Sequence, residues 1–151
     1  MQLKRVVITG IGALTPIGNS TADYWAALLR GVSGAGPITL FDASKFKTRF
    51  ACELKGFDPL QYLDRKESRK VDRYTQIALA ASDEAVHDAG LDTEKINPDR
   101  IGVVFASGIG GLITFQDEVI NFAKGDGTPR FNPFFIPKMI LIPKNIVTFL
   151  C

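Results

Sequence analysis

The sequence has few of the residues that build disulfide scaffolds or metal centres. Its 151 residues include two cysteines, Cys52 and Cys151, and one histidine, His87. Two thiols are too few for a disulfide framework, and no spacing of Cys and His matches a zinc motif. The sequence therefore predicts a protein of a reducing cytoplasm without a metal site.

Long apolar runs and a strong charge of one sign are also missing. Apolar residues make up 46% of the chain, and 18 Lys and Arg against 16 Asp and Glu leave a net charge of +2. No apolar run approaches the roughly 20 residues that cross a bilayer. Disorder would need low hydrophobicity and a high net charge. These features favour one soluble globular domain of ordinary size.

The N-terminus begins as a secretory signal does, with Lys4 and Arg5 before an apolar stretch. Thr9 and Gly10 interrupt this stretch early, and no small-residue cleavage site follows. Residues 5–9 instead predict a buried β-strand that enters a glycine turn.

Predicted strands and helices alternate along the chain. A second strand is expected at residues 101–106. Helices are expected at residues 21–30, 61–73, 74–89 and 112–123, the first capped by Ser20 or Thr21 and stopped by Gly31. This alternation is typical of an α/β layered architecture.

Two of these helices have a face that we expect to be buried. Trp25, Leu28 and Leu29 share one face of the first helix. The helix at residues 74–89 carries a stripe of small residues, which would let another backbone approach closely. The members of this stripe are Ala78, Ala81, Ala85 and Ala89.

Two glycine-rich turns resemble ligand-binding loops only in part. Gly10 and Gly12 match the start of a dinucleotide fingerprint, but Thr15 stands where its third glycine belongs. A structural turn is therefore favoured there. Residues 107–111 lack both the lysine of a phosphate loop and the first glycine of a nucleophile elbow, where Phe105 stands. What is left is a flexible loop after a strand, where α/β sheets usually bind ligands.

The charge excess lies in residues 64–73, which hold five cations and three acids. On a helix, Arg65, Arg69 and Arg73 would form one ridge. Such a ridge could attract an acidic partner. The alternative is a solvated face with local ion pairs to Asp64, Glu67 and Asp72, and the residues alone favour it. No aromatic pattern or reader motif indicates nucleic-acid binding. His87, in a polar stretch, is expected to have a surface or structural role.

Several motifs in order resemble the N-terminal part of β-ketoacyl-[acyl-carrier-protein] synthase II, the elongating condensing enzyme of fatty acid biosynthesis. The resemblance covers residues 1–140. It rests on residues 5–12 and 15–19, Phe41-Asp42, Asp64-Arg65-Lys66, Ser107-Gly108-Ile109-Gly110-Gly111 and Asn132-Pro133-Phe134-Phe135-Ile136-Pro137.

The resemblance implies part of the N-terminal half of a thiolase-like αβαβα fold, in a cytoplasmic homodimer. The family's reaction is a decarboxylative Claisen condensation of an acyl-enzyme with malonyl-acyl carrier protein. An active-site cysteine suits it because a thiolate is intrinsically nucleophilic. The implied partner is acyl carrier protein, acyl- or malonyl-loaded, whose 4′-phosphopantetheine brings the substrate. No resident cofactor, metal, nucleic acid or membrane is implied.

The matching positions imply two groups of site residues. Ile109, Phe134 and Phe135 match the acyl pocket of the family. The cations that match its carrier-protein docking patch are Arg65, Lys66, Arg69 and Lys70.

The chain departs from the family pattern after residue 140. In the family, the nucleophile follows in an Ala-Cys-Ala context roughly thirty residues past the proline-rich motif. Cys151 lies too early and lacks that context, and His87 matches neither catalytic histidine. We therefore expect no catalytic residue in this chain, a domain over residues 1–140 and a divergent tail over residues 141–151. A truncated or frame-shifted synthase would be inactive alone and poorly soluble.

Overall fold

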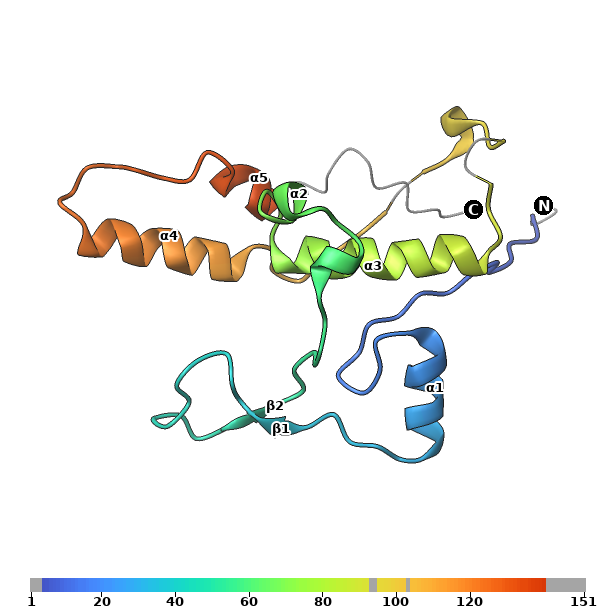
Figure 1. Cartoon of the computed structure of the whole chain (residues 1–151), viewed down its shortest axis with the longest axis horizontal. Coiled ribbons are helices and arrows are strands. Elements are labelled where there is room, and N and C mark those ends of the chain that lie inside the picture. The colour runs from blue at the N-terminus through green and yellow to red at the C-terminus, as the bar shows by residue number, and fades with distance from the viewer. Residues whose placement is uncertain (1–3, 93–94, 103, 141–151) are drawn as a thin grey trace.

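The structure is a computed structural model and describes residues 4–92, 95–102 and 104–140. Helix α3 runs through the middle of the molecule, with α1 and a small β-hairpin on one side and α4 next to its N-terminal end (Figure 1). The helices are α1 (Thr21–Leu29), α2 (Arg65–Ser68), α3 (Arg73–Asp88), α4 (Leu112–Lys124) and α5 (Phe135–Ile140). The strands are β1 (Gly36–Pro37) and β2 (Phe50–Ala51), and the 3₁₀ turns are η1 (Pro59–Gln61) and η2 (Pro98–Arg100).

Helix α3 forms almost where the sequence predicts it. The Asp72 carboxylate accepts a hydrogen bond from the backbone N–H of Tyr74 and so caps the helix. Gly90 ends it with a φ of +61°. The alanine stripe does bring another backbone close, because a Cβ on Gly12 would lie 1.8 Å from the carbonyl oxygen of Ala81. This close packing fixes the glycine turn on α3.

Helix α1 also begins as predicted, with the Ser20 hydroxyl accepting from the backbone N–H of Asp23. Its apolar face, however, is not covered. Trp25 is 61% exposed and Leu29 is 71% exposed, and Ala27 is the buried residue of this helix. The prediction that Trp25, Leu28 and Leu29 pack inward is therefore wrong for this structure, since no described element covers that face.

The prediction of a single helix over residues 61–73 is wrong. Instead, the segment contains η1, the short α2 and the start of α3. The cause is a pair of aspartates, Asp64 and Asp72, which both adopt an extended backbone and accept N–H groups of the following turn. Each one starts a new helix and so interrupts the previous one.

The two predicted parallel strands do not form strands among the described residues. The strands of the described chain are β1 and β2, which pair antiparallel with Gly36 opposite Ala51. Val6, Ile8 and Val104 are instead 74%, 84% and 70% exposed. A strand needs hydrogen-bonding neighbours, so an apolar β-branched run alone does not make one.

Candidate functional site

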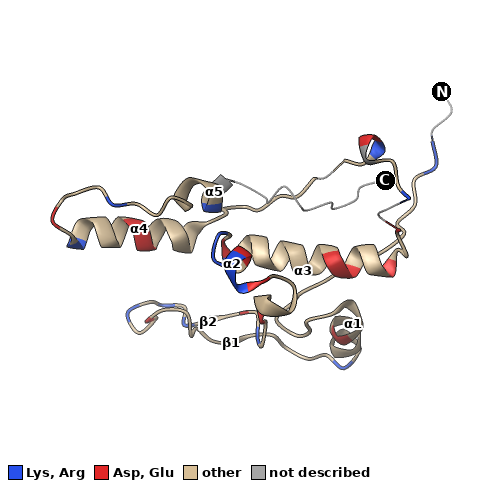
Figure 2. Ribbon diagram, turned by 45° about the horizontal axis from the view of Figure 1, so that its top comes forward, with Lys and Arg blue, Asp and Glu red and all other residues tan. Residues whose placement is uncertain are grey.

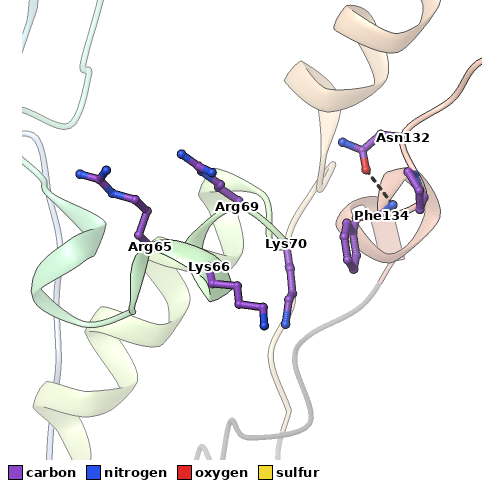
Figure 3. Close-up of a pocket in the computed structure, with 7 residues that line it drawn as sticks. Arg65, Lys66, Arg69, Lys70, Asn132 and Phe134 are labelled. Atoms are coloured by element: carbon purple, nitrogen blue, oxygen red, sulfur yellow. Dashed lines mark hydrogen bonds between the residues drawn. The ribbon is translucent and has the colours of Figure 1, made fainter.

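A groove of about 680 Å³ lies between α2 and the segment that leads into α5 (Figure 3). Its walls come from two segments that are far apart in the sequence, residues 65–70 and 132–134. One wall carries the four predicted docking cations, and the other carries one of the predicted aromatic residues. The groove is lined by Arg65, Lys66, Arg69, Lys70, Asn132, Pro133 and Phe134.

Asp64 positions the basic wall of the groove. One oxygen of its carboxylate accepts hydrogen bonds from the backbone N–H of Lys66 at 2.7 Å and of Glu67 at 2.9 Å. These bonds, from Glu67 first and then Lys66, lower the pKa of Asp64, and the charges of Lys70 and Lys66 add to this effect. An ionised Asp64 therefore holds the short turn that presents the cations.

Most of the cations in this wall are not neutralised locally. Lys70 forms an ion pair with Glu67, whereas Arg65, Lys66 and Arg69 form none with the described part of the chain. Figure 2 shows the basic residues gathered at α2. Of the three acids expected to pair locally, Glu67 is thus the one that does so within the described residues.

Asp64 and Asp72, the other two acids of residues 64–73, have structural roles. Arg73, the last cation of these residues, also has one. Asp72 accepts from Tyr74 and also from the hydroxyl of Thr114 on α4. The predicted ridge does not include Arg73, because this residue is the first of α3 and its side chain contacts Phe57. Its guanidinium lies 5.4 Å from the ring centre of Phe57, in a cation–π contact.

Asn132 builds the aromatic wall of the groove. Its side-chain oxygen accepts from the backbone N–H of Phe134 at 2.8 Å, and its own N–H donates to Glu118 of α4 at 3.1 Å. The Phe134 ring lies on the side of α5 that faces Lys70 (Figure 3). An apolar ring is therefore placed beside a row of cations.

Phe135 has a different environment from Phe134. Its ring stacks on Phe115 of α4 at 6.2 Å and on Phe131 at 5.7 Å, and Phe131 in turn stacks on Phe122 at 5.6 Å. This row of rings fastens the segment before α5 to α4. Phe135 thus supports the groove wall and does not line the groove.

Ile109 is also outside the groove. It is 72% exposed at the tip of the loop over residues 107–111. The glycines behind it are confined, because a Cβ on Gly110 would lie 2.8 Å from the Tyr74 ring and one on Gly111 would lie 2.8 Å from Met139. The described structure therefore does not bring Ile109, Phe134 and Phe135 together, and their shared role in an acyl pocket stays a prediction.

Sequence reasoning missed two acids that hold the N-terminal glycine turn. The Glu84 carboxylate accepts from the backbone N–H of Ala13 at 2.8 Å and of Thr21 at 2.7 Å. Asp88 accepts from Ile11 at 2.9 Å. These N–H groups are therefore already bonded to carboxylates, which supports the structural reading of this turn over a phosphate site. No sequence spacing reveals contacts between residues more than sixty positions apart.

His87 is exposed in the last turn of α3. This position fits the predicted surface role. Over the described residues, no group of three His, Cys, Asp or Glu side chains could hold a metal ion. The helices in that part of the chain are also too short or too polar to cross a membrane.

A comparison with protein families decides the identity of this domain. The family model "Beta-ketoacyl synthase, N-terminal domain" matches residues 3–150. The chain belongs to the beta-ketoacyl synthase family. The match extends beyond residue 140, and the predicted boundary there stays a prediction, since residues 141–151 lie outside those described.

Curated relatives support the more specific resemblance. The 3-oxoacyl-[acyl-carrier-protein] synthase 2 of Synechocystis sp. is 48% identical over 140 residues, which are 93% of this chain and 33% of the relative. The enzyme of the same name from Coxiella burnetii is 43% identical over 141 residues, which are 93% of this chain and 34% of the relative. The predicted similarity to synthase II is confirmed. The chain spans about a third of the length of these relatives.

Solved ketosynthase structures share the fold. A complex of a type II polyketide synthase acyl-carrier protein with its ketosynthase matches with a TM-score of 0.74 and 25% identity over 91% of this chain and 36% of that chain. A beta-ketoacyl synthase from Burkholderia phymatum matches with a TM-score of 0.72 and 29% identity, over 91% of this chain and 34% of its own. The predicted α/β, thiolase-like fold class is thus confirmed for part of a ketosynthase.

Proposed function

We propose that this chain carries the carrier-protein docking surface of an elongating β-ketoacyl-acyl carrier protein synthase of fatty acid biosynthesis. The complete enzyme would condense an acyl-enzyme with malonyl-acyl carrier protein, as a cytoplasmic homodimer. The substrate would arrive on the pantetheine arm of the carrier protein, so no resident cofactor is required. Neither Cys151 nor His87 matches a catalytic residue of the family, so the 151 residues alone should not catalyse the condensation.

One observation carries this proposal: three cations on one wall of a groove form no ion pair with any described residue. Arg65, Lys66 and Arg69 are exposed and lie together on α2 and its C-cap. Like charges held close together attract an acidic partner and speed its association. One of the similar solved structures is a ketosynthase in complex with an acyl-carrier protein.

Phe134 supports the same function from the opposite wall. Its ring is 40% exposed and offers an apolar surface next to the cations. A carrier protein delivers an acidic surface and an acyl chain together, and the groove offers a complement to each. We therefore assign the acyl-facing role in this groove to Phe134, with Phe135 holding its backbone in place.

The test is direct binding of acyl carrier protein, measured by fluorescence anisotropy with acylated and unloaded forms. The Arg69→Glu variant should weaken binding at least tenfold, because it replaces an attraction by a repulsion. Raising the salt concentration should weaken binding by the wild-type chain, since exposed charges are screened within about 10 Å at 0.1 M salt. Phe134→Ser should reduce the preference for the acylated form.

The matched control is Lys47→Glu, the same change of charge at an exposed lysine of the β1–β2 hairpin. It should alter the affinity less than Arg69→Glu does, and circular dichroism should show that both variants keep their helices. Equal effects of the two variants, or no binding at all, would refute the docking surface.

A non-catalytic carrier-protein binding module is the second candidate function. It uses the same groove of cations and Phe134, and it needs none of the family's catalytic residues, which neither Cys151 nor His87 matches. An assay for condensation of acyl- and malonyl-acyl carrier protein distinguishes the two. Carrier-protein binding without product supports the module for this chain, whereas product formation would show that the expected inactivity is wrong.

A further inference from the structure

The loop that closes the β1–β2 hairpin mixes basic and large apolar side chains. Every residue from 44 to 50 is exposed, and this stretch contains no acid. Leu40 and Phe41, just before it, are 68% and 53% exposed. Phe46 and Phe50, within it, are 56% and 64% exposed. The hairpin lies on the side of α3 away from α5, and basic residues are spread through its loop (Figures 1 and 2). These cations are Lys45, Lys47 and Arg49.

Contacts within the hairpin hold this loop in shape. The Nε–H of Arg49 donates to the backbone carbonyl oxygen of Phe46 at 3.0 Å. The rings of Phe46 and Phe41 pack edge to face, with their centres 5.6 Å apart. At the base of the loop, the Glu53 carboxylate accepts a hydrogen bond from the backbone N–H of Thr39 at 3.0 Å. The exposed side chains therefore project from a backbone that is already ordered.

The cations of the loop are not neutralised by the described part of the chain. None of them forms an ion pair there. The acids nearest in sequence are Asp42 and Glu53, and both are bonded elsewhere. Asp42 accepts from the backbone N–H of Ser44 at 2.9 Å, and Glu53 also accepts from the hydroxyl of Thr39 at 2.6 Å. The positive field of the loop is therefore available to an anionic partner outside the chain.

The combination of side chains favours an anionic lipid bilayer over a soluble polyanion. Basic side chains are attracted to anionic headgroups, while aromatic and aliphatic side chains enter the boundary between headgroups and acyl chains. Single-stranded nucleic acid would instead stack its bases on open aromatic faces. In the pair of Phe41 and Phe46, the edge of one ring covers a face of the other, and the aliphatic Leu40 offers no such face. Hydrocarbon needs neither a flat ring nor a particular ring orientation.

We propose that residues 40–50 form a peripheral contact site for an anionic phospholipid bilayer. The exposed apolar side chains would enter the interface, and the three cations would lie at the lipid phosphates. Each cation near such a surface strengthens binding about fivefold. This contact goes beyond the family resemblance, which implies no membrane, and it does not depend on the carrier-protein groove.

The test is flotation of the 151-residue chain with vesicles, made either of phosphatidylcholine alone or of equal parts phosphatidylcholine and phosphatidylglycerol. Binding to the anionic vesicles should be at least about tenfold stronger and should weaken with salt. Replacing Lys45 and Lys47 together by Gln should weaken it about 25-fold. Leu40→Ser should also weaken it, because an apolar side chain is lost from the interface. The matched controls are Lys124→Gln on α4 and Leu29→Ser on α1, both at exposed positions, and they should change the binding far less.

A second measurement tests whether the loop enters the bilayer. Trp25 is the one tryptophan of the chain, so Trp25→Phe removes the background fluorescence. An indole introduced by Phe46→Trp should then be quenched by brominated lipid in the anionic vesicles. Circular dichroism should show that all variants keep their helices, because the changed side chains are exposed.

Three results would overturn the proposal. They are equal binding to both kinds of vesicle, equal losses in the loop and control variants, and an indole at position 46 that brominated lipid does not quench. Loop-dependent binding of polyuridylate or polyglutamate without binding to vesicles would also overturn it, and would assign the loop to a soluble polyanion.

Discussion

At the scale of single residues, the N-terminal glycines are explained by contact and not by ligand binding. Gly10 and Gly12 lie where a Cβ would collide with the backbone of α3, at Ala85 and Ala81. The sequence favoured a structural turn because the third glycine of the dinucleotide motif is missing. The structure adds Glu84, whose carboxylate holds this turn and the start of α1 together.

Gly12→Ala should therefore destabilise the packing of the turn on α3. We expect a cost of about 1–3 kcal/mol, since the added methyl group has no space and the opposing atoms belong to a helix backbone. The thermal midpoint measured by circular dichroism should fall. Gly36→Ala is the matched control, because nothing lies within 4 Å of its added Cβ. Equal midpoints for the two variants would contradict the close contact.

At the scale of helices and strands, side-chain caps explain why residues 64–73 do not form the single helix that their spacing predicts. The charged residues 64–73 have helical spacing, yet Asp64 and Asp72 each begin a helix and so divide the segment. The division separates Arg73 from the other cations and leaves α2 as a single turn that faces the segment before α5. The basic wall of the groove thus depends on a carboxylate cap.

This dependence predicts a loss of the α2 cap in acid. The pKa of Asp64 is lowered from its usual value of 3.8, chiefly by the N–H groups of Glu67 and Lys66. The folded state therefore gains stability from the ionised group above that value and loses it as the pH falls through the lower, folded pKa. The amide resonances of Lys66 and Glu67 should follow this titration by NMR. Asp64→Asn keeps a capping oxygen and should abolish the titration, and a persistent transition in that variant would refute the assignment to Asp64.

At the scale of the whole molecule, the described chain is open. Apolar side chains remain exposed on α1, on α4 and at residues 5–9. Exposed apolar patches of this extent are typical of interaction surfaces and of chains that aggregate. These patches are the physical basis for the poor solubility that the sequence led us to expect, which stays a prediction.

The chain alone should therefore associate at micromolar concentration and bind a hydrophobic dye such as ANS. Its thermal transition should be broad, because few side chains are fully buried in the described core, namely Thr75 and small alanines such as Ala78 and Ala80. Sedimentation and calorimetry measure these properties. A monomer that melts in one sharp transition without dye binding would contradict the open structure.

The sequence by itself determined the family, the boundaries of α1, α3 and α4, and the four cations that line one wall of the groove. These features depend on neighbours within a few positions, such as Ser20 before α1 and Gly90 after α3, or on motifs that stand in order along the chain. Local chemistry is enough to specify them.

Only the tertiary structure decided which of these residues meet. It placed Phe134 opposite the cations of α2, moved Phe135 into a stack on α4, and left Ile109 outside the groove. It also showed that residues 5–9, 101–102 and 104–106 form no strand within the described chain. The physical reason is that strand pairing and groove formation need partners distant in sequence, and no local pattern encodes whether those partners are in reach.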